Sequence, residues 1–80
     1  MKRYGNISGS SGVSEFEIAD TYILVRFDND KKIYKYSYAR PGRDHVEKMK
    51  AFAESGAGLS TYISQNVKRK YEEIIVAPDR

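Results

Sequence analysis

The sequence predicts an α+β domain, in which two helices pack on one face of an antiparallel sheet. Two periodicities lead to this class. Residues 14–38 alternate apolar and polar side chains in short runs, which is typical of strands, whereas residues 44–71 repeat apolar side chains every three or four positions, which is typical of helices. Strands and helices that are segregated along a chain in this way form two layers. With 80 residues, the chain has room for one domain with a small core.

The expected domain does not begin at the first residue. Residues 5–12 are rich in Gly and Ser and show no periodicity, so we expect residues 1–12 to be a flexible lead-in. The domain then spans residues 13–77. Pro78 stops the last apolar run, and residues 78–80 are expected to form a tail.

The first half of the domain predicts a three-stranded antiparallel meander. In residues 14–21, two apolar side chains alternate with glutamates, as in a half-buried strand. Residues 22–27 are dense in β-branched and aromatic side chains, and the Asp-Asn-Asp sequence at 28–30 can form the following turn. The third strand is expected at 33–38. Residues 73–77 either add a fourth, C-terminal strand or lie against the helices.

Two amphipathic helices are expected in the second half. Pro41-Gly42 ends the third strand, and Asp44 followed by Glu47 has the form of a capping box, so the first helix should begin there. The glycines of residues 55–58 should end it, and a second helix should run over 60–70. The side chains expected in the core are Phe16, Ile18, Val25, Phe27, Val46, Met49, Phe52, Ile63 and Val67.

Residues 32–43 combine tyrosines with cationic side chains and contain no acid. Because side chains alternate along a strand, Tyr34, Tyr36 and Tyr38 should share one face. We expect this face to be the core or its rim, since a sheet covered by helices needs one apolar face. The alternative is an exposed platform on which bases stack. In an intermediate arrangement, Tyr34 and Tyr36 are structural while Tyr38 and Arg40 stay available to a ligand.

Cations are concentrated in residues 32–43 and again in residues 68–70, within a net charge of +3. Such clusters favour an anionic partner. The structural alternatives are lysines that protect a sheet edge and cations that complement a helix C-terminus. The candidate nucleic-acid-binding residues are Lys32, Lys35, Tyr38, Arg40, Arg43, Lys68, Arg69 and Lys70.

No residue pattern indicates catalysis, a metal or a cofactor. His45, the sole histidine, is beside Asp44 in the expected first helical turn, where a surface role is favoured over a general base. The chain has no cysteine, and one histidine with scattered acids makes no ligand set. Nucleophile-elbow and phosphate-loop motifs are absent as well. We therefore expect a protein that is not an enzyme and needs no cofactor.

The sequence also contains no signal-peptide core and no run of eighteen apolar residues. We expect a cytoplasmic protein that does not enter the membrane and that is a monomer or a weak dimer.

Several short motifs occur in a characteristic order along the chain. They are Ser10-Ser11, the strand Ile23-Leu24-Val25-Arg26-Phe27, Tyr34 and Tyr36 with a proline nearby, Ala53 and Ser55 followed by Gly, and Val67 with Tyr71. In this order the chain resembles the KTSC domain over about residues 8–72. That family is named for a C-terminal module of some lysyl-tRNA synthetases and also occurs as a stand-alone bacterial protein. This chain has Asp28-Asn29-Asp30 where the family usually has a hairpin glycine, and its stretch 55–60 is about two residues longer.

Two classes of function follow from these observations. The resemblance implies RNA binding, which has been suggested for a family that has no established activity. The cationic clusters favour the same class, a small module that binds RNA or other single-stranded nucleic acid. The alternative is a protein–protein interaction module, which would use an exposed apolar patch or a free sheet edge.

Overall fold

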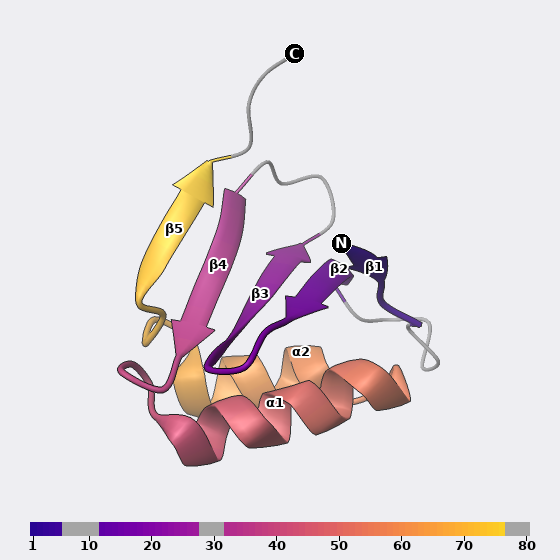
Figure 1. The fold of residues 1–80 in the computed structure, drawn as a ribbon. Coiled ribbons are helices and arrows are strands. Elements are labelled where there is room, and N and C mark those ends of the chain that lie inside the picture. The colour runs from indigo at the N-terminus through magenta and orange to yellow at the C-terminus, as the bar shows by residue number, and fades with distance from the viewer. Residues whose placement is uncertain (6–11, 28–31, 77–80) are drawn as a thin grey trace.

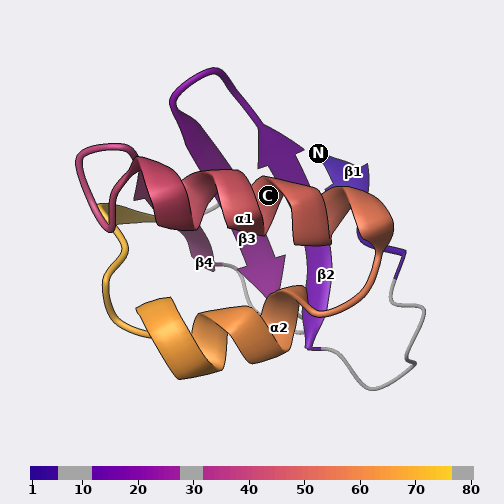
Figure 2. The same ribbon diagram turned by 90° about the horizontal axis from the view of Figure 1, so that it is seen from below.

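The computed structural model describes residues 1–5, 12–27 and 32–76, and it confirms the α+β class. In these residues five strands form one antiparallel sheet in the order β1-β2-β3-β4-β5, and the helical segments lie together on one side of it (Figures 1 and 2). The strands are β1 (Lys2–Arg3), β2 (Val13–Ile18), β3 (Tyr22–Phe27), β4 (Lys32–Ser37) and β5 (Glu73–Val76). The helical segments are α1 (Arg43–Ser55), α2 (Leu59–Tyr62) and a π-helical turn, η1 (Ile63–Val67). The expected turn at 28–30, positions 6–11 of the expected lead-in, residue 77 and the expected tail lie outside the described residues.

Strands β2, β3 and β4 form the expected meander. Strand β2 ends at Ile18, earlier than expected, because the Ala19 amide donates to the Tyr22 carbonyl and closes the turn to β3. Residues 73–76 pair antiparallel with β4, from Lys35 opposite Glu73 to Lys32 opposite Val76. Of the two alternatives for this segment, the C-terminal strand in the sheet is therefore the one that forms.

The expected lead-in over residues 1–12 is wrong for residues 2–4. Strand β1 pairs with β2, and the Tyr4 amide donates to the Ser14 carbonyl at 2.9 Å. The Tyr4 side chain is 3% exposed, and its hydroxyl accepts a hydrogen bond from the Leu59 amide at 3.2 Å. Leu59 is the first residue of α2, where backbone amides have no partner within the helix. Tyr4 thus joins the start of the chain to the start of the second helix.

The expected capping box at Asp44 and Glu47 is also wrong. The Val46 amide donates to the Gly42 carbonyl, so the helix begins at Arg43 and Asp44 is already within its first turn. Gly42 has a φ of 121°, which favours glycine, and it caps α1 without a side-chain hydrogen bond. The Glu47 carboxylate instead accepts hydrogen bonds from Tyr38 and Lys50.

The second helical segment differs from the helix expected over 60–70. It runs over α2 and η1, from Leu59 to Val67, so Lys68 and the two cations after it follow the last helical turn. The apolar stripe that predicted the segment is present, with Leu59, Ile63 and Val67 all buried.

The core lies between the sheet and the helices. Six of the nine expected core residues are buried, and Ile18, Phe27 and Phe52 are partly buried against them. Tyr36 is 1% exposed, with Tyr34 and Tyr38 partly buried beside it, which confirms that the tyrosine face is core and core rim. The buried hydrophobic residues absent from the expected list are Tyr4, Val13, Ile23, Tyr36, Ala53 and Leu59.

We expect Tyr4→Ala to lower the free energy of unfolding by about 3–5 kcal/mol, the usual cost of truncating a buried aromatic side chain. Tyr4→Phe should cost about 1–3 kcal/mol, because the buried Leu59 amide loses its acceptor. Urea denaturation followed by circular dichroism measures both. Lys2→Ala, an exposed change in the same segment, serves as the control. A Tyr4→Ala variant as stable as the parent would show that the N-terminal strand contributes nothing to the fold.

Candidate functional site

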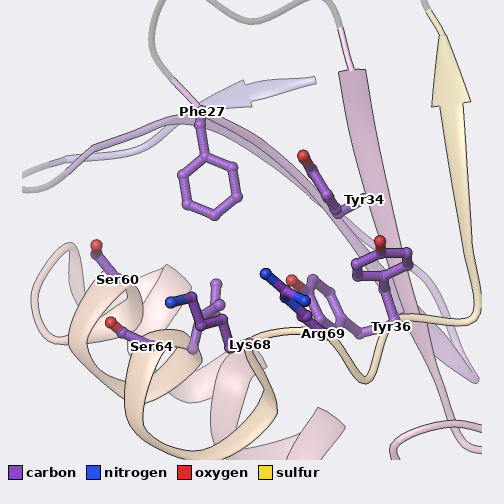
Figure 3. Close-up of a pocket in the computed structure, with 9 residues that line it drawn as sticks. Phe27, Tyr34, Tyr36, Ser60, Ser64, Lys68 and Arg69 are labelled. Atoms are coloured by element: carbon purple, nitrogen blue, oxygen red, sulfur yellow. The ribbon is translucent and has the colours of Figure 1, made fainter.

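A groove of about 440 Å³ opens between the sheet and the second helical segment. Its sheet side is formed by side chains of β3 and β4, and its helix side by side chains of α2, η1 and the residues after them (Figure 3). We call it the aromatic groove. Its lining residues are Phe27, Tyr34, Tyr36, Ser60, Ile63, Ser64, Lys68, Arg69 and Tyr71.

Four aromatic rings pack edge to face in the groove, three from the sheet and one, Tyr71, from the chain that follows η1. The ring centroids of Phe27 and Tyr34 are 5.6 Å apart, and those of Tyr34 and Tyr71 are 5.1 Å apart. The ring centroids of Tyr36 and Tyr71 are 6.3 Å apart. Edge-to-face packing of this kind holds rings in fixed orientations. Phe27, Tyr34 and Tyr71 are only partly buried, so they offer aromatic surface to a ligand.

Tyr36 is the buried floor of this aromatic wall. Burial raises the pKa of its hydroxyl, and the neighbouring Tyr34 and Tyr71 raise it further. The hydroxyl therefore stays protonated at physiological pH, which suits a structural residue and not an acid–base catalyst.

Apart from Ile63 and Tyr71, the helix side of the groove is polar and cationic. Ser60 and Ser64 line the groove from the second helical segment, four positions apart, and Lys68 and Arg69 approach from the chain that follows η1 (Figure 3). Both cations are exposed, and neither forms an ion pair with any residue that the structure describes. Among the residues that the structure describes, none that lines the groove carries a carboxylate. Two unpaired cations beside aromatic rings give the groove the character of a site for an anion with a planar group.

Two other cations of the described chain, Lys50 and Lys35, are already engaged. Lys50 bonds to the Glu47 carboxylate and the Asp20 carbonyl, both at 3.0 Å. Lys35 lies 4.0 Å from Glu72 and 3.9 Å from Glu73. Compared with these side chains, Lys68 and Arg69 can meet an added anion without breaking an internal pair.

The eight candidate residues do not form one surface. Lys35 lies on the opposite face of the sheet from Tyr34 and Tyr36, and its ammonium is 4.7 Å from the Tyr22 ring centroid. Lys35 and Tyr38 line a separate hollow of about 150 Å³. Only Lys68 and Arg69, of the eight, line the aromatic groove.

Tyr38, Arg40 and Arg43 lie near the start of α1. The Tyr38 hydroxyl donates to Glu47 at 2.5 Å, and its ring lies under the Arg43 guanidinium and the Lys50 ammonium, at 5.7 and 5.5 Å. Cations of the same chain thus already occupy positions near the ring on which a base was expected to stack. Arg40 is exposed in the turn before α1.

Lys32 and Lys70 lie outside the groove lining. Lys32 is exposed at the start of β4 and shares the helix-facing side of the sheet with Tyr34, two residues along the strand. Lys70 is exposed, and its amide donates to the Val67 carbonyl just after η1.

Sequence reasoning missed most of the groove. Ser60, Ser64 and Lys68 recur every four positions, a polar stripe that could have indicated a second functional face on this helical segment. Tyr71 follows Ile63 and Val67 at spacings of four, so by periodicity alone it continues the apolar stripe of the second helix. Its contacts with Tyr34 and Tyr36 depend on how the chain returns to the sheet after η1, which local periodicity does not encode.

His45 joins the two helices. Its Nδ1 lies 2.6 Å from the Tyr62 hydroxyl, and burial, followed by the nearby Asp44 carboxylate, raises the pKa of that hydroxyl. The pair packs outside the aromatic groove. In residues 1–5, 12–27 and 32–76, no three His, Cys, Asp or Glu side chains gather as metal ligands, and no helix is long and apolar enough to cross a membrane.

No family model, curated protein or solved structure matches this chain. The resemblance to the KTSC domain therefore stays a prediction. The case for a function depends on the groove residues themselves.

The Tyr38–Glu47 bond gives a prediction about pH. The Tyr38 hydroxyl, followed by Lys50, lowers the pKa of the Glu47 carboxylate, while the bond to Glu47 raises the pKa of Tyr38. The bond should stabilise the fold between the ordinary pKa values of Glu and Tyr, about 4.3 and about 10, and should be lost below and above that window.

We expect Tyr38→Phe to raise the Glu47 pKa toward its ordinary value. Carboxyl ¹³C chemical shifts followed against pH measure it. The control is Tyr34→Phe, because Tyr34 lines the aromatic groove and the Glu47 carboxylate accepts from Tyr38 and Lys50 instead. An unchanged Glu47 pKa in Tyr38→Phe would show that the hydroxyl does not stabilise the carboxylate in solution.

Proposed function

We propose that this chain is a non-enzymatic module that binds single-stranded nucleic acid, with RNA as the preferred ligand. The observation that supports it is the aromatic groove, in which partly exposed rings and two cations come together. Within the described part of the chain, these cations have no ion-pair partner and no carboxylate lines the groove. Single-stranded nucleic acid offers the complementary groups, planar bases and phosphates, in alternation.

Each part of the groove has a role in this proposal. Tyr34, Phe27 and Tyr71 provide the surface on which a base stacks, a contact worth about 1–3 kcal/mol. Lys68 and Arg69 contact the phosphates. The Ser60 and Ser64 hydroxyls can donate to, or accept from, the sugar or the base edge. A volume of about 440 Å³ is within the usual range of small-ligand sites, so the groove holds one or two nucleotides, and a longer strand would extend past it.

The preference for RNA comes from the sequence. The resemblance to the KTSC domain implies RNA binding, and the absence of cysteine is compatible with the reducing cytoplasm, where RNA is abundant. The proposed binding needs no metal or cofactor, because stacking and charge pairing supply the recognition.

A protein-interaction module is the second candidate. It is favoured by Ile75 and Val76, which are 39% and 66% exposed on the edge strand β5. The salt dependence of binding distinguishes a nucleic-acid module from a protein-interaction module. Affinity that depends on phosphate contacts falls steeply as the salt concentration rises, whereas affinity that depends on apolar contacts does not.

The charge contribution can be tested with the Lys68→Glu/Arg69→Glu double variant. We expect binding of a short unstructured RNA, measured by fluorescence anisotropy, to weaken at least about tenfold at low salt. If each cation engages one phosphate, the log–log slope of affinity against salt becomes shallower by about 1.4. Single-stranded DNA in parallel reports the preference for RNA.

The matched control is Arg40→Glu/Arg43→Glu, which makes the same change in net charge outside the groove. This control should bind almost as the parent does. An equal loss in both double variants would show that net charge, and not the groove, governs binding. A parent Kd weaker than about 10⁻⁴ M at low salt would end the nucleic-acid proposal.

The stacking contribution can be tested with Tyr34→Leu. Leucine keeps an apolar side chain beside Phe27 and Tyr71 but removes the ring, so affinity should fall by about 1–3 kcal/mol with an unchanged salt slope. The same anisotropy titrations measure it, and thermal melting confirms that the variant is folded. Tyr22→Leu, on the other face of the sheet, is the control. Loss of affinity in the control alone would place stacking on the uncovered face.

A further inference from the structure

The two edges of the sheet differ in length and chemistry. Strand β1 is two residues long, and both of them, Lys2 and Arg3, are cationic and exposed. Strand β5 is four residues long, and its Ile75 and Val76 are exposed. With Met1, these two are the exposed large hydrophobic residues of the described chain.

An edge strand presents unpaired amides and carbonyls, which pair readily with another strand. Short length and cationic side chains are the usual protection, and β1 has both. Strand β5 is twice as long and has no cation, and its one charged side chain, Glu73, lies at its start. It extends away from the helices beside β4, so the helical layer does not cover its outer edge (Figure 1).

We propose that β5 pairs antiparallel with β5 of a second copy of this chain, around a two-fold axis perpendicular to the sheet. The two sheets then continue into one another, with both helical layers on the same side. This proposal does not depend on the nucleic-acid proposal, because the aromatic groove contains no residue of β5.

The side chains of β5 select one register. Residues opposite each other in an antiparallel pair share a face of the sheet, so a two-fold axis must pass through a residue pair such as Ile75 and Ile75 of the second copy. An axis at Glu73 would place the two Glu73 carboxylates opposite each other. An axis at Ile74 would place Glu73 opposite Ile75. An axis at Ile75 avoids both mismatches and places Ile74 opposite Val76.

The cross-strand pairs of the uncovered face support the same register. Along one row, Glu15 is opposite Arg26, Arg26 is opposite Ile33, and Ile33 is opposite Ile75. Arg26 Nε lies 3.0 Å from Glu15 Oε1. The two side chains form an ion pair, but this contact does not have the geometry of a hydrogen bond. In the proposed dimer, Ile33 and Ile75 of one copy lie in one row with Ile75 and Ile33 of the other. The Arg26–Glu15 ion pair of each copy flanks this row at its two ends. This self-complementarity favours a second copy over an unrelated strand.

The absence of cysteine from the chain allows a direct test, because Ile75→Cys introduces a single thiol. In the proposed register the two thiols are opposite each other on the axis, with Cβ atoms about 4.5–5.5 Å apart, close to disulfide geometry. We expect rapid formation of a disulfide-linked dimer under mild oxidation, read by non-reducing electrophoresis.

The control is Glu73→Cys, an exposed position on the same strand. In this register the two introduced thiols are separated by four residues along the pair, about 13 Å, too far for a disulfide. Linkage at 75 that is much faster than at 73 supports the proposal. Equal rates at both positions, as random collision would give, overturn it.

Sedimentation velocity of the cysteine-free parent provides the second measurement. The interface is small, so we expect the weight-average sedimentation coefficient to rise between tens of micromolar and about one millimolar protein. Ile75→Lys should remove this rise without unfolding the exposed strand, whereas Ala51→Lys, an exposed position on α1, should keep it. A parent that stays monomeric throughout, or an Ile75→Lys variant that still associates, overturns the proposal.

Discussion

Burial on a single face of the sheet is the constraint on which the rest of this structure depends. The described helical segments all lie on one side, so nearly all the apolar surface that stabilises the fold must be gathered there. This requirement explains why Ile23, Val25 and Tyr36 point to the same layer as Val46 and Met49. The other face of the sheet keeps charges and partly exposed side chains, which water can solvate.

The candidate site is a result of the same arrangement. The second helical segment is short, and where it ends the inner face of β4 is only partly covered, so Tyr34 and Tyr71 complete the layer with aromatic rings instead of aliphatic packing. The cations that follow η1 then come next to those rings. A wider helical layer would bury Tyr34 and leave no groove.

The parts of the fold that depend on local periodicity could be predicted from the sequence. The strands of the meander and the apolar face of α1 are examples. The role of Tyr4 could not be, because a two-residue strand has no periodicity and its hydrogen bond joins residues 4 and 59. Asp44 matched a capping pattern, but Gly42 provided an earlier start for the helix. In the site, the cations Lys68 and Arg69 were identified, whereas the ion pairs of Lys35 with Glu72 and Glu73 could not be, because they depend on how β5 pairs with β4.

The position of Lys68 and Arg69 in the groove depends on the π-helical turn η1, and therefore on the number of residues in this segment. A π turn accommodates one residue more than an α turn, and such turns occur often at functional sites. Each residue of an α-helix rotates the chain by about 100°, so a chain one residue shorter between Ile63 and Val67 would form a regular helix and turn Lys68 and Arg69 away from the aromatic wall. In this segment an insertion or deletion, more than any substitution, would decide whether a descendant of this chain keeps its cations beside its tyrosines.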